Sequence, residues 1–247
     1  MKDTQSAQDL LASIFVGNSD MAKLMRSHDW SSTTLGDPAG WTLTLRSAVN
    51  ILLTSKFEMW VGWGPDIAFL YNDAYRPTLG NKHPNALGVP TRELYAEIWE
   101  EVAPRLRLVY EQGESTWDRA LLLILHRHGY PEETYHTFSY SPLSGDDGKV
   151  EGIFCAVSEE TERVISGRRL ESLGSLASSI AGAEQLDTFF QSVSSAAAKA
   201  DRDILFSALY QLDEAGAPTP LYEELGGAVL EPRSVWRLDT LGGDVNQ

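Results

Sequence analysis

The spacing of hydrophobic residues along the chain changes twice. In the first 54 residues, hydrophobic side chains recur at intervals of three or four, as Leu10 and Ile14 do, which predicts amphipathic helices. From residue 57 they form shorter runs rich in aromatic and β-branched residues, which is typical of strands. From residue 159 the helical interval returns. The pattern therefore predicts a sheet-containing region between two helical regions.

The central region is expected to hold five strands and one long helix. Two strands, at 57–63 and 66–71, flank Gly64-Pro65, a dipeptide typical of a hairpin turn. A helix is predicted over 95–112, with a kink or a restart at Pro104 because proline lacks an amide hydrogen. Three more strands are predicted at 115–124, 133–141 and 149–157. This order indicates an α+β fold with an antiparallel sheet.

The region after residue 159 is expected to pass from a polar helix into a smaller second domain. Four hydrophobic residues follow the 3-4-3 spacing of a short coiled-coil seam, and they are Leu170, Leu173, Ala177 and Ile180. Such a seam favours a homodimer. A helix over 186–200 is expected next, with strands over 205–212 and 220–224, and this domain is expected to be cut off within its fold.

Composition and charge exclude several classes of partner. The formal net charge is −15 and the pI is near 4.7, which argues against nucleic acid and against anionic lipid surfaces. The longest apolar run, over 120–125, is far shorter than the roughly 20 residues of a membrane span. We therefore expect a cytoplasmic protein that does not insert into a membrane. Cys155 is the only cysteine, so no internal disulfide forms.

Several linked motifs in the central region resemble one known domain family. They are Leu70-Tyr-Asn-Asp-Ala-Tyr75, Asn81-Lys-His-Pro84, Gly129-Tyr-Pro-Glu-Glu133 and Thr137-Phe-Ser-Tyr-Ser-Pro142. Together with Trp41 and the strand from Trp60 to Trp63, they make residues 20 to 165 similar to PAS domains at the front of multidomain bacterial sensor histidine kinases. Residues 186 to 240 resemble the first part of a GAF domain, through Phe206-Ser-Ala-Leu-Tyr210 and Val235-Trp-Arg-Leu238.

The resemblance implies a division of the chain into four parts. These are an N-terminal helical extension (1–54), a PAS core with a five-stranded antiparallel sheet and flanking helices (55–158), a signalling helix (159–184), and a truncated GAF-like α/β segment (185–247). The implied function is a sensory input module of a two-component signalling protein, relaying a cue through a dimeric helix to a kinase domain downstream in the same parent chain. The alternative is a ligand-independent PAS module for dimerisation or protein interaction.

The resemblance also places a ligand pocket between the sheet and the short helices. Aromatic residues are expected to surround it, with stacking as the mode of binding: Trp60, Phe69, Tyr75, Trp99, Phe138, Tyr140 and Phe154. The competing interpretation is that these side chains fill the core themselves. The pocket leaves room for a small molecule of unknown identity.

Two further sets of residues are expected to have structural or signalling roles. Asn72 and Asp73 match the family's position at a strand-to-helix junction, where the Asn amide caps the next helix. Many PAS domains end their last strand in Asp-Ile-Thr, which locks the exit helix onto the sheet. Here Glu159-Glu160-Thr161 occupies that position, so Glu159 and Thr161 are the expected coupling residues, with a charged residue in place of the apolar one.

No residue pattern in the chain indicates catalysis, so whether it is an enzyme stays open. No phosphoacceptor histidine motif, ATP-binding glycine box or Ser-His-Asp spacing is visible. His126 and His128, with Glu132 and Glu133, suggest at most a partial metal site for a hydrolase, against the simpler interpretation of a surface loop. His83 does not lie on the long helix that carries the ligand in haem PAS domains, and Cys155 lies outside the flavin-reactive motif. Haem and covalent flavin are therefore not expected.

Overall fold

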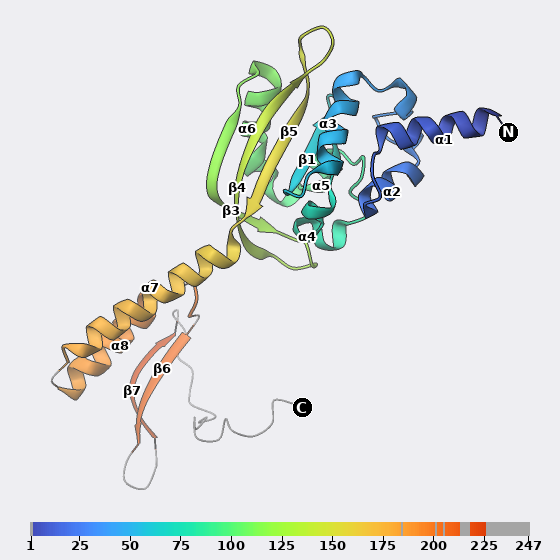
Figure 1. The fold of residues 1–247 in the computed structure, drawn as a ribbon. Helices are drawn as coiled ribbons and strands as arrows, with labels where there is room; N and C mark the ends of the chain where they lie inside the picture. The colour runs from blue at the N-terminus through green and yellow to red at the C-terminus, as the bar shows by residue number, and fades with distance from the viewer. Residues whose placement is uncertain (1, 184, 201, 205, 213–217, 226–247) are drawn as a thin grey trace, which may run out of the picture. The chain divides into compact units, whose positions relative to one another are not determined.

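The computed structural model describes residues 2–183, 185–200, 202–204, 206–212 and 218–225. The chain divides into two compact units, Met1–Val164 and Ile165–Gln247 (Figure 1). The first unit holds most of the buried hydrophobic side chains, and every site described below lies in it.

The first unit is built on one five-stranded antiparallel sheet with the order β2-β1-β5-β4-β3. The sequence patterns predicted all five strands and their antiparallel arrangement, and the sheet confirms both. The strands are β1 (Met59–Trp63), β2 (Ala68–Tyr71), β3 (Thr116–Leu125), β4 (Glu132–Ser144) and β5 (Val150–Glu159).

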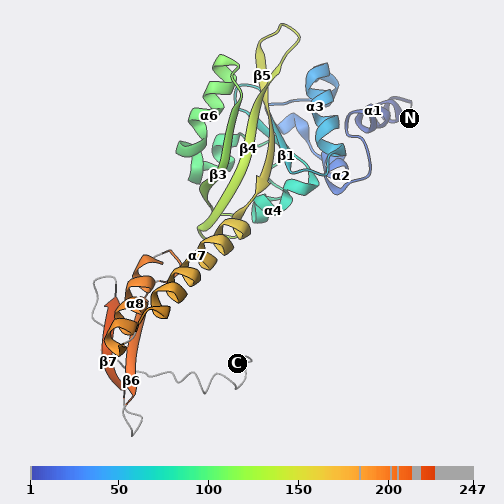
Figure 2. The same ribbon diagram turned by 60° about the vertical axis from the view of Figure 1, so that its left-hand side comes forward.

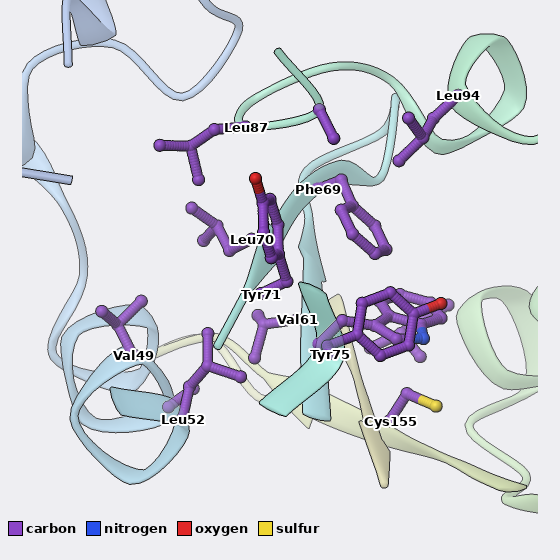
Figure 3. Close-up of a cluster of buried hydrophobic side chains, with 14 of the residues drawn as sticks. Val49, Leu52, Val61, Phe69, Leu70, Tyr71, Tyr75, Leu87, Leu94 and Cys155 are labelled. Atoms are coloured by element: carbon purple, nitrogen blue, oxygen red, sulfur yellow. The ribbon is translucent and has the colours of Figure 1, made fainter. Parts of the chain in front are cut away.

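Helices cover both faces of this sheet (Figure 2). The longest helix of the first unit, α6 (Trp99–Gln112), packs on the face that we call the inner face, while α3 (Leu43–Thr54) packs on the outer face. Figure 3 shows Val61 on the side of Leu52 from α3, and Cys155 on the side of Tyr75. Neighbouring residues of a strand point to opposite faces of the sheet. This alternation therefore determines which side chains pack against α6 and which pack against α3.

The inner face is covered by a succession of short helical turns before α6 begins. They are η3 (Asp73–Tyr75), α4 (Arg76–Leu79), η4 (Gly80–Lys82), α5 (Thr91–Leu94) and η5 (Ala96–Ile98). α6 then runs without interruption past Pro104 and ends at Gly113, which has a left-handed φ of 70°. The restart expected at Pro104 therefore occurs earlier, at Trp99, so that Pro104 lies in the second turn of the helix.

Aromatic side chains hold together the N-terminal segment of the first unit. It consists of α1 (Lys2–Ile14), α2 (Asp20–Ser27) and two short turns, η1 (Trp30–Ser32) and η2 (Pro38–Gly40). Phe15 stacks on Trp30 at 5.6 Å between ring centroids, and Trp30 meets Trp41 edge-on at 4.9 Å. Ser19 caps α2, whose Met21 amide also donates to the Asp73 carboxylate at 3.2 Å.

The second unit includes most of α7 (Thr161–Ala181), which starts at the end of the first unit and continues along the chain. Leu170 and Leu173 of the predicted seam are exposed. A helix and a two-stranded antiparallel sheet follow, α8 (Leu186–Lys199), β6 (Phe206–Leu212) and β7 (Pro218–Leu225). The Val235-Trp-Arg-Leu238 motif lies outside the described residues. Among the described helices, none is long and apolar enough to span a membrane.

Candidate functional site

An enclosed cavity lies between the inner face of the sheet and α6. Its volume is about 40 Å³, which has room for only a few water molecules. Strands β1, β4 and β5 line it with Trp60, Phe138, Tyr140 and Cys155, and α6 closes it with Leu106. Aromatic side chains thus fill most of the space between sheet and helices, with centroid distances of 4.7 Å for Phe138 and Tyr140.

Two tyrosine hydroxyls meet in this cavity. The hydroxyl oxygens of Tyr75 and Tyr95 lie 2.7 Å apart in a buried hydrogen bond. Burial raises the pKa of both phenols well above the ordinary value, so both are neutral. The pair places two hydrogen-bonded hydroxyls in the lining of this mainly apolar cavity.

Asn72 fixes the position of Tyr75. Its side-chain carbonyl accepts hydrogen bonds from the amides of Tyr75 and Met59, both at 3.2 Å, and its amide nitrogen donates to the Phe57 carbonyl at 2.7 Å. The Asn72 side chain is 1% exposed. A buried amide with all these partners joins β1 to the turn after β2, which positions η3 under the cavity.

His136 and Cys155 are two cavity residues that the sequence did not single out as lining it. The His136 imidazole lies 3.1 Å from the Thr134 hydroxyl through Nε2, and burial lowers its pKa to about 4. Cys155 is buried, and burial raises the pKa of its thiol. Both side chains are therefore uncharged at neutral pH, which suits an apolar compartment.

The expected ligand-pocket residues divide among three places. Trp60, Tyr75, Phe138 and Tyr140 line the cavity. Phe69 is fully buried beside it, 5.1 Å from the Trp60 ring. The structure corrects the other two placements. Trp99 lines an open groove on the far side of α6, because the helix begins at this residue and turns it outward. Phe154 lies on the outer face with α3, because its neighbour Cys155 takes the inner face.

A second cluster joins the end of β5 to the first turn of α7. Arg127 donates to both oxygens of the Glu159 carboxylate, at 2.7 and 3.0 Å, and to Glu132 at 3.1 Å. The Thr161 hydroxyl donates to Glu159 at 2.8 Å and accepts from the Tyr135 amide at 3.0 Å. We call Arg127, Glu159 and Thr161 the junction cluster. Arg127 and Thr161 lower the pKa of Glu159 against the effect of its burial, so it is ionised at neutral pH.

Glu160, at the position where PAS domains often have an apolar residue, also forms a hydrogen bond to the sheet. Its carboxylate accepts from the Thr137 hydroxyl at 2.5 Å and pairs with Arg163 in the first turn of α7. The Thr137 hydroxyl in turn accepts from the Ala120 amide at 2.9 Å, at the bulge in β3. The substitution therefore adds a second polar link between the sheet and α7.

The histidines proposed for metal or haem have other partners. His83 Nδ1 lies 2.8 Å from the Tyr71 hydroxyl, and His128 Nδ1 lies 2.9 Å from Glu132. His126 and His128 belong to the loop between β3 and β4. Among the described residues, no group of three or more His, Cys, Asp or Glu side chains is arranged to hold a metal ion.

Comparison with known proteins identifies the fold of the first unit. Residues 64–165 match a family model described as PAS fold. Similar solved structures include a Rhodobacter sphaeroides LOV protein, with 14% identity and a TM-score of 0.41 over 64% of this chain and 93% of that one. They also include an RNA-binding light-oxygen-voltage receptor, with 24% identity and a TM-score of 0.39 over 59% of this chain and 41% of the receptor.

A sensory box sensor histidine kinase from Vibrio cholerae is also similar, at 15% identity and a TM-score of 0.33, over 47% of this chain and 90% of that chain. No curated protein matches the sequence significantly. The matched family model and the five-stranded antiparallel sheet with helices on both faces agree with each other. The first unit therefore has the PAS fold.

Proposed function

We propose that this chain is a sensory input module, in which the PAS unit detects a cue and passes it to α7. The observation that carries the proposal is the junction cluster. Through Glu159, at the end of β5, it connects Arg127, in the loop between β3 and β4, with Thr161, the first residue of α7. A shift of the sheet at this point changes the contacts of the helix, which is the requirement for a relay.

The cavity lies next to this cluster. His136 lines the cavity and is the register partner of Glu159 across β4 and β5. A ligand or a structural change that moves His136 therefore also moves Glu159, whose carboxylate binds Arg127. In the proposed relay, the helix carries the change along a dimer to a histidine kinase domain in the parent chain. We propose that residues 185–247 form the start of a GAF-like domain between α7 and this kinase domain.

Hydrogen exchange measured by mass spectrometry tests the relay. Glu159→Gln removes the charge that Arg127 binds, and we expect faster exchange in the first turn of α7 with little change in the core of the sheet. Glu162→Gln is the matched control, because Glu162 lies three residues after Glu159 and is exposed. We expect this variant to exchange like the original chain. Equal exchange in all three chains would contradict the relay through Glu159.

A ligand-independent interaction module is the second candidate function. The cavity volume of about 40 Å³ favours it, since small-molecule pockets are usually several hundred cubic ångströms. The outer face of β3 also carries large exposed apolar side chains, Trp117, Leu122 and Ile124. Native mass spectrometry separates the two candidates. A small molecule bound one per chain supports sensing by the cavity, and a bare dimer supports the interaction module.

A further inference from the structure

An open groove lies on the side of α6 away from the enclosed cavity. Its volume is about 560 Å³, within the range typical of small-molecule sites. The floor comes from α6 through Trp99, Ala103, Leu106 and Tyr110, whose 4-3-4 spacing places them on one face of the helix. Trp99 and Tyr110 are half-buried, so each ring offers an apolar surface to the groove.

The walls of the groove are held firmly. One wall is the turn between β1 and β2, which includes Ile67, and the other is the segment that begins at Pro90. The backbone amide and the hydroxyl of Thr91 both donate to the Ile67 carbonyl, at 3.2 and 2.6 Å. Ile67 has a φ of 50°, a left-handed conformation that β-branched residues rarely adopt. The groove is therefore formed before any ligand binds.

Five charged side chains line this groove, all of them exposed, and within the described part of the chain none is in an ion pair. They are Arg92, Arg107, Asp66, Glu93 and Glu111. Elsewhere in the same unit, Arg105 and Arg127 bind carboxylates through two nitrogens. Charges of both signs surround an aromatic floor. A ligand that carries one positive and one negative group can therefore form an ion pair with each kind of side chain.

We propose that this groove binds a zwitterionic aromatic molecule of amino-acid size. Arg92 and Glu93 are consecutive residues that both line the groove, and the Arg92 guanidinium lies over the Trp99 ring, 5.9 Å from its centroid. The ligand's carboxylate pairs with Arg92, its ammonium pairs with Glu93, and its ring lies on the apolar floor that α6 provides. This groove is separate from the enclosed cavity, so its occupancy does not depend on the proposed relay.

The charge pattern favours a ligand with both charges over a ligand with one. Three carboxylates and two guanidiniums line the groove, so an anion that pairs with a guanidinium also lies near carboxylates. A cation has the opposite conflict with Arg92 and Arg107. A ligand with both charges meets a complementary partner for each, and mismatched charges at a binding site reduce affinity and give specificity.

Isothermal titration calorimetry on the full chain tests the proposal with three probes. L-Phenylalanine carries both charges, 3-phenylpropionate lacks the ammonium, and 2-phenylethylamine lacks the carboxylate. We expect L-phenylalanine to bind at least about tenfold more tightly than either of the others, because each lost charge-assisted contact costs about that factor. L-Tyrosine and L-tryptophan are expected to bind as well, since their rings stack in the same way.

Variants locate the binding. Arg92→Gln and Glu93→Gln are each expected to weaken L-phenylalanine binding about tenfold. Glu100→Gln, an exposed position on α6 outside the groove, is expected to leave it unchanged. Circular dichroism melting checks that all three variants stay folded. No heat with the three amino acids at millimolar concentration overturns the proposal. Binding that does not prefer the zwitterion, or that survives Arg92→Gln and Glu93→Gln unchanged, also overturns it.

Discussion

The hydroxyls of Tyr75 and Tyr95 form a 2.7 Å hydrogen bond inside the PAS unit, although 20 residues separate them in the chain. Tyr75 closes η3 and Tyr95 follows α5, so the bond ties together two of the segments that cover the inner face. Each hydroxyl is buried and depends on the other as a partner. Removing one therefore harms the fold more than removing both.

Substitutions at these two tyrosines are predicted to be non-additive. Tyr95→Phe leaves the Tyr75 hydroxyl buried without this partner and is expected to lower the free energy of unfolding by about 1–3 kcal/mol. The double variant with Tyr75→Phe is expected to cost less than the sum of the single variants. Urea denaturation of the four chains gives the coupling energy. Strict additivity would show that the hydrogen bond contributes nothing to stability.

Thr161 offers a test of the start of α7. Thr161→Val keeps the shape of the side chain but removes the hydroxyl that donates to Glu159 and accepts from the Tyr135 amide. We expect a loss of about 1–2 kcal/mol in the free energy of unfolding of the PAS unit, from the two lost hydrogen bonds. Thr161→Ser keeps the hydroxyl and is the matched control. An unchanged free energy of unfolding in the Val variant would show that these two hydrogen bonds contribute nothing to stability.

The stability of the PAS unit is predicted to depend on pH through His136. Burial lowers the pKa of His136 to about 4, with Glu159 opposing this shift and Arg127 favouring it. Above pH 6.5 the imidazole is neutral in both states, and the stability is fully present. As the pH falls from 6.5 toward 4, the unfolded chain binds a proton that the folded chain does not, so the free energy of unfolding decreases.

The measurement compares the original chain with His136→Gln, so that the carboxylate contributions common to both cancel. Between pH 7 and pH 5, the original chain is expected to lose about 1–2 kcal/mol more than the variant in the free energy of unfolding. Parallel pH dependences of the two chains would show that His136 titrates in the folded state as it does in the unfolded one.

Gly80 is predicted to tolerate no side chain. Its φ is 53°, and an added Cβ would lie 2.4 Å from the backbone carbonyl oxygen of Arg127. Because a backbone atom cannot rotate away, Gly80→Ala is expected to cost about 3 kcal/mol or more in unfolding free energy. Gly17→Ala is the control, since Gly17 has a φ of 82° but no atom near the added Cβ. It is expected to cost about 1 kcal/mol. Similar losses in both variants would rule out the steric contribution at Gly80.

The strand positions followed from the sequence because they depend on local pattern. Alternating and β-branched residues marked all five strands, and Gly64-Pro65 marked the turn between the first two. The phase of that alternation was harder to predict. Phe154 and Cys155 are both hydrophobic, so nothing in their immediate neighbours says which of them faces α6. The sequence therefore placed Phe154 in the cavity, where the structure has Cys155.

The junction cluster and the groove depend on contacts between distant residues. Arg127 and Glu159 are 32 residues apart, and the loop that carries Arg127 reads as an ordinary polar turn. The resemblance to PAS domains pointed to Glu159 and Thr161 but not to their arginine partner. Trp99 was expected in the cavity as one of the aromatic residues of the pocket, and its helix was expected to begin at Tyr95. The short turn before Trp99 rotates it outward instead.

Leu106 forms part of the wall of both the enclosed cavity and the open groove. One layer of side chains thus separates a nearly filled compartment from one that solvent reaches. Shortening this residue, as in Leu106→Ala, would connect the two without altering a strand or a turn. The side chain at position 106 therefore contributes to two compartments of very different volume, so one change on one helix alters both.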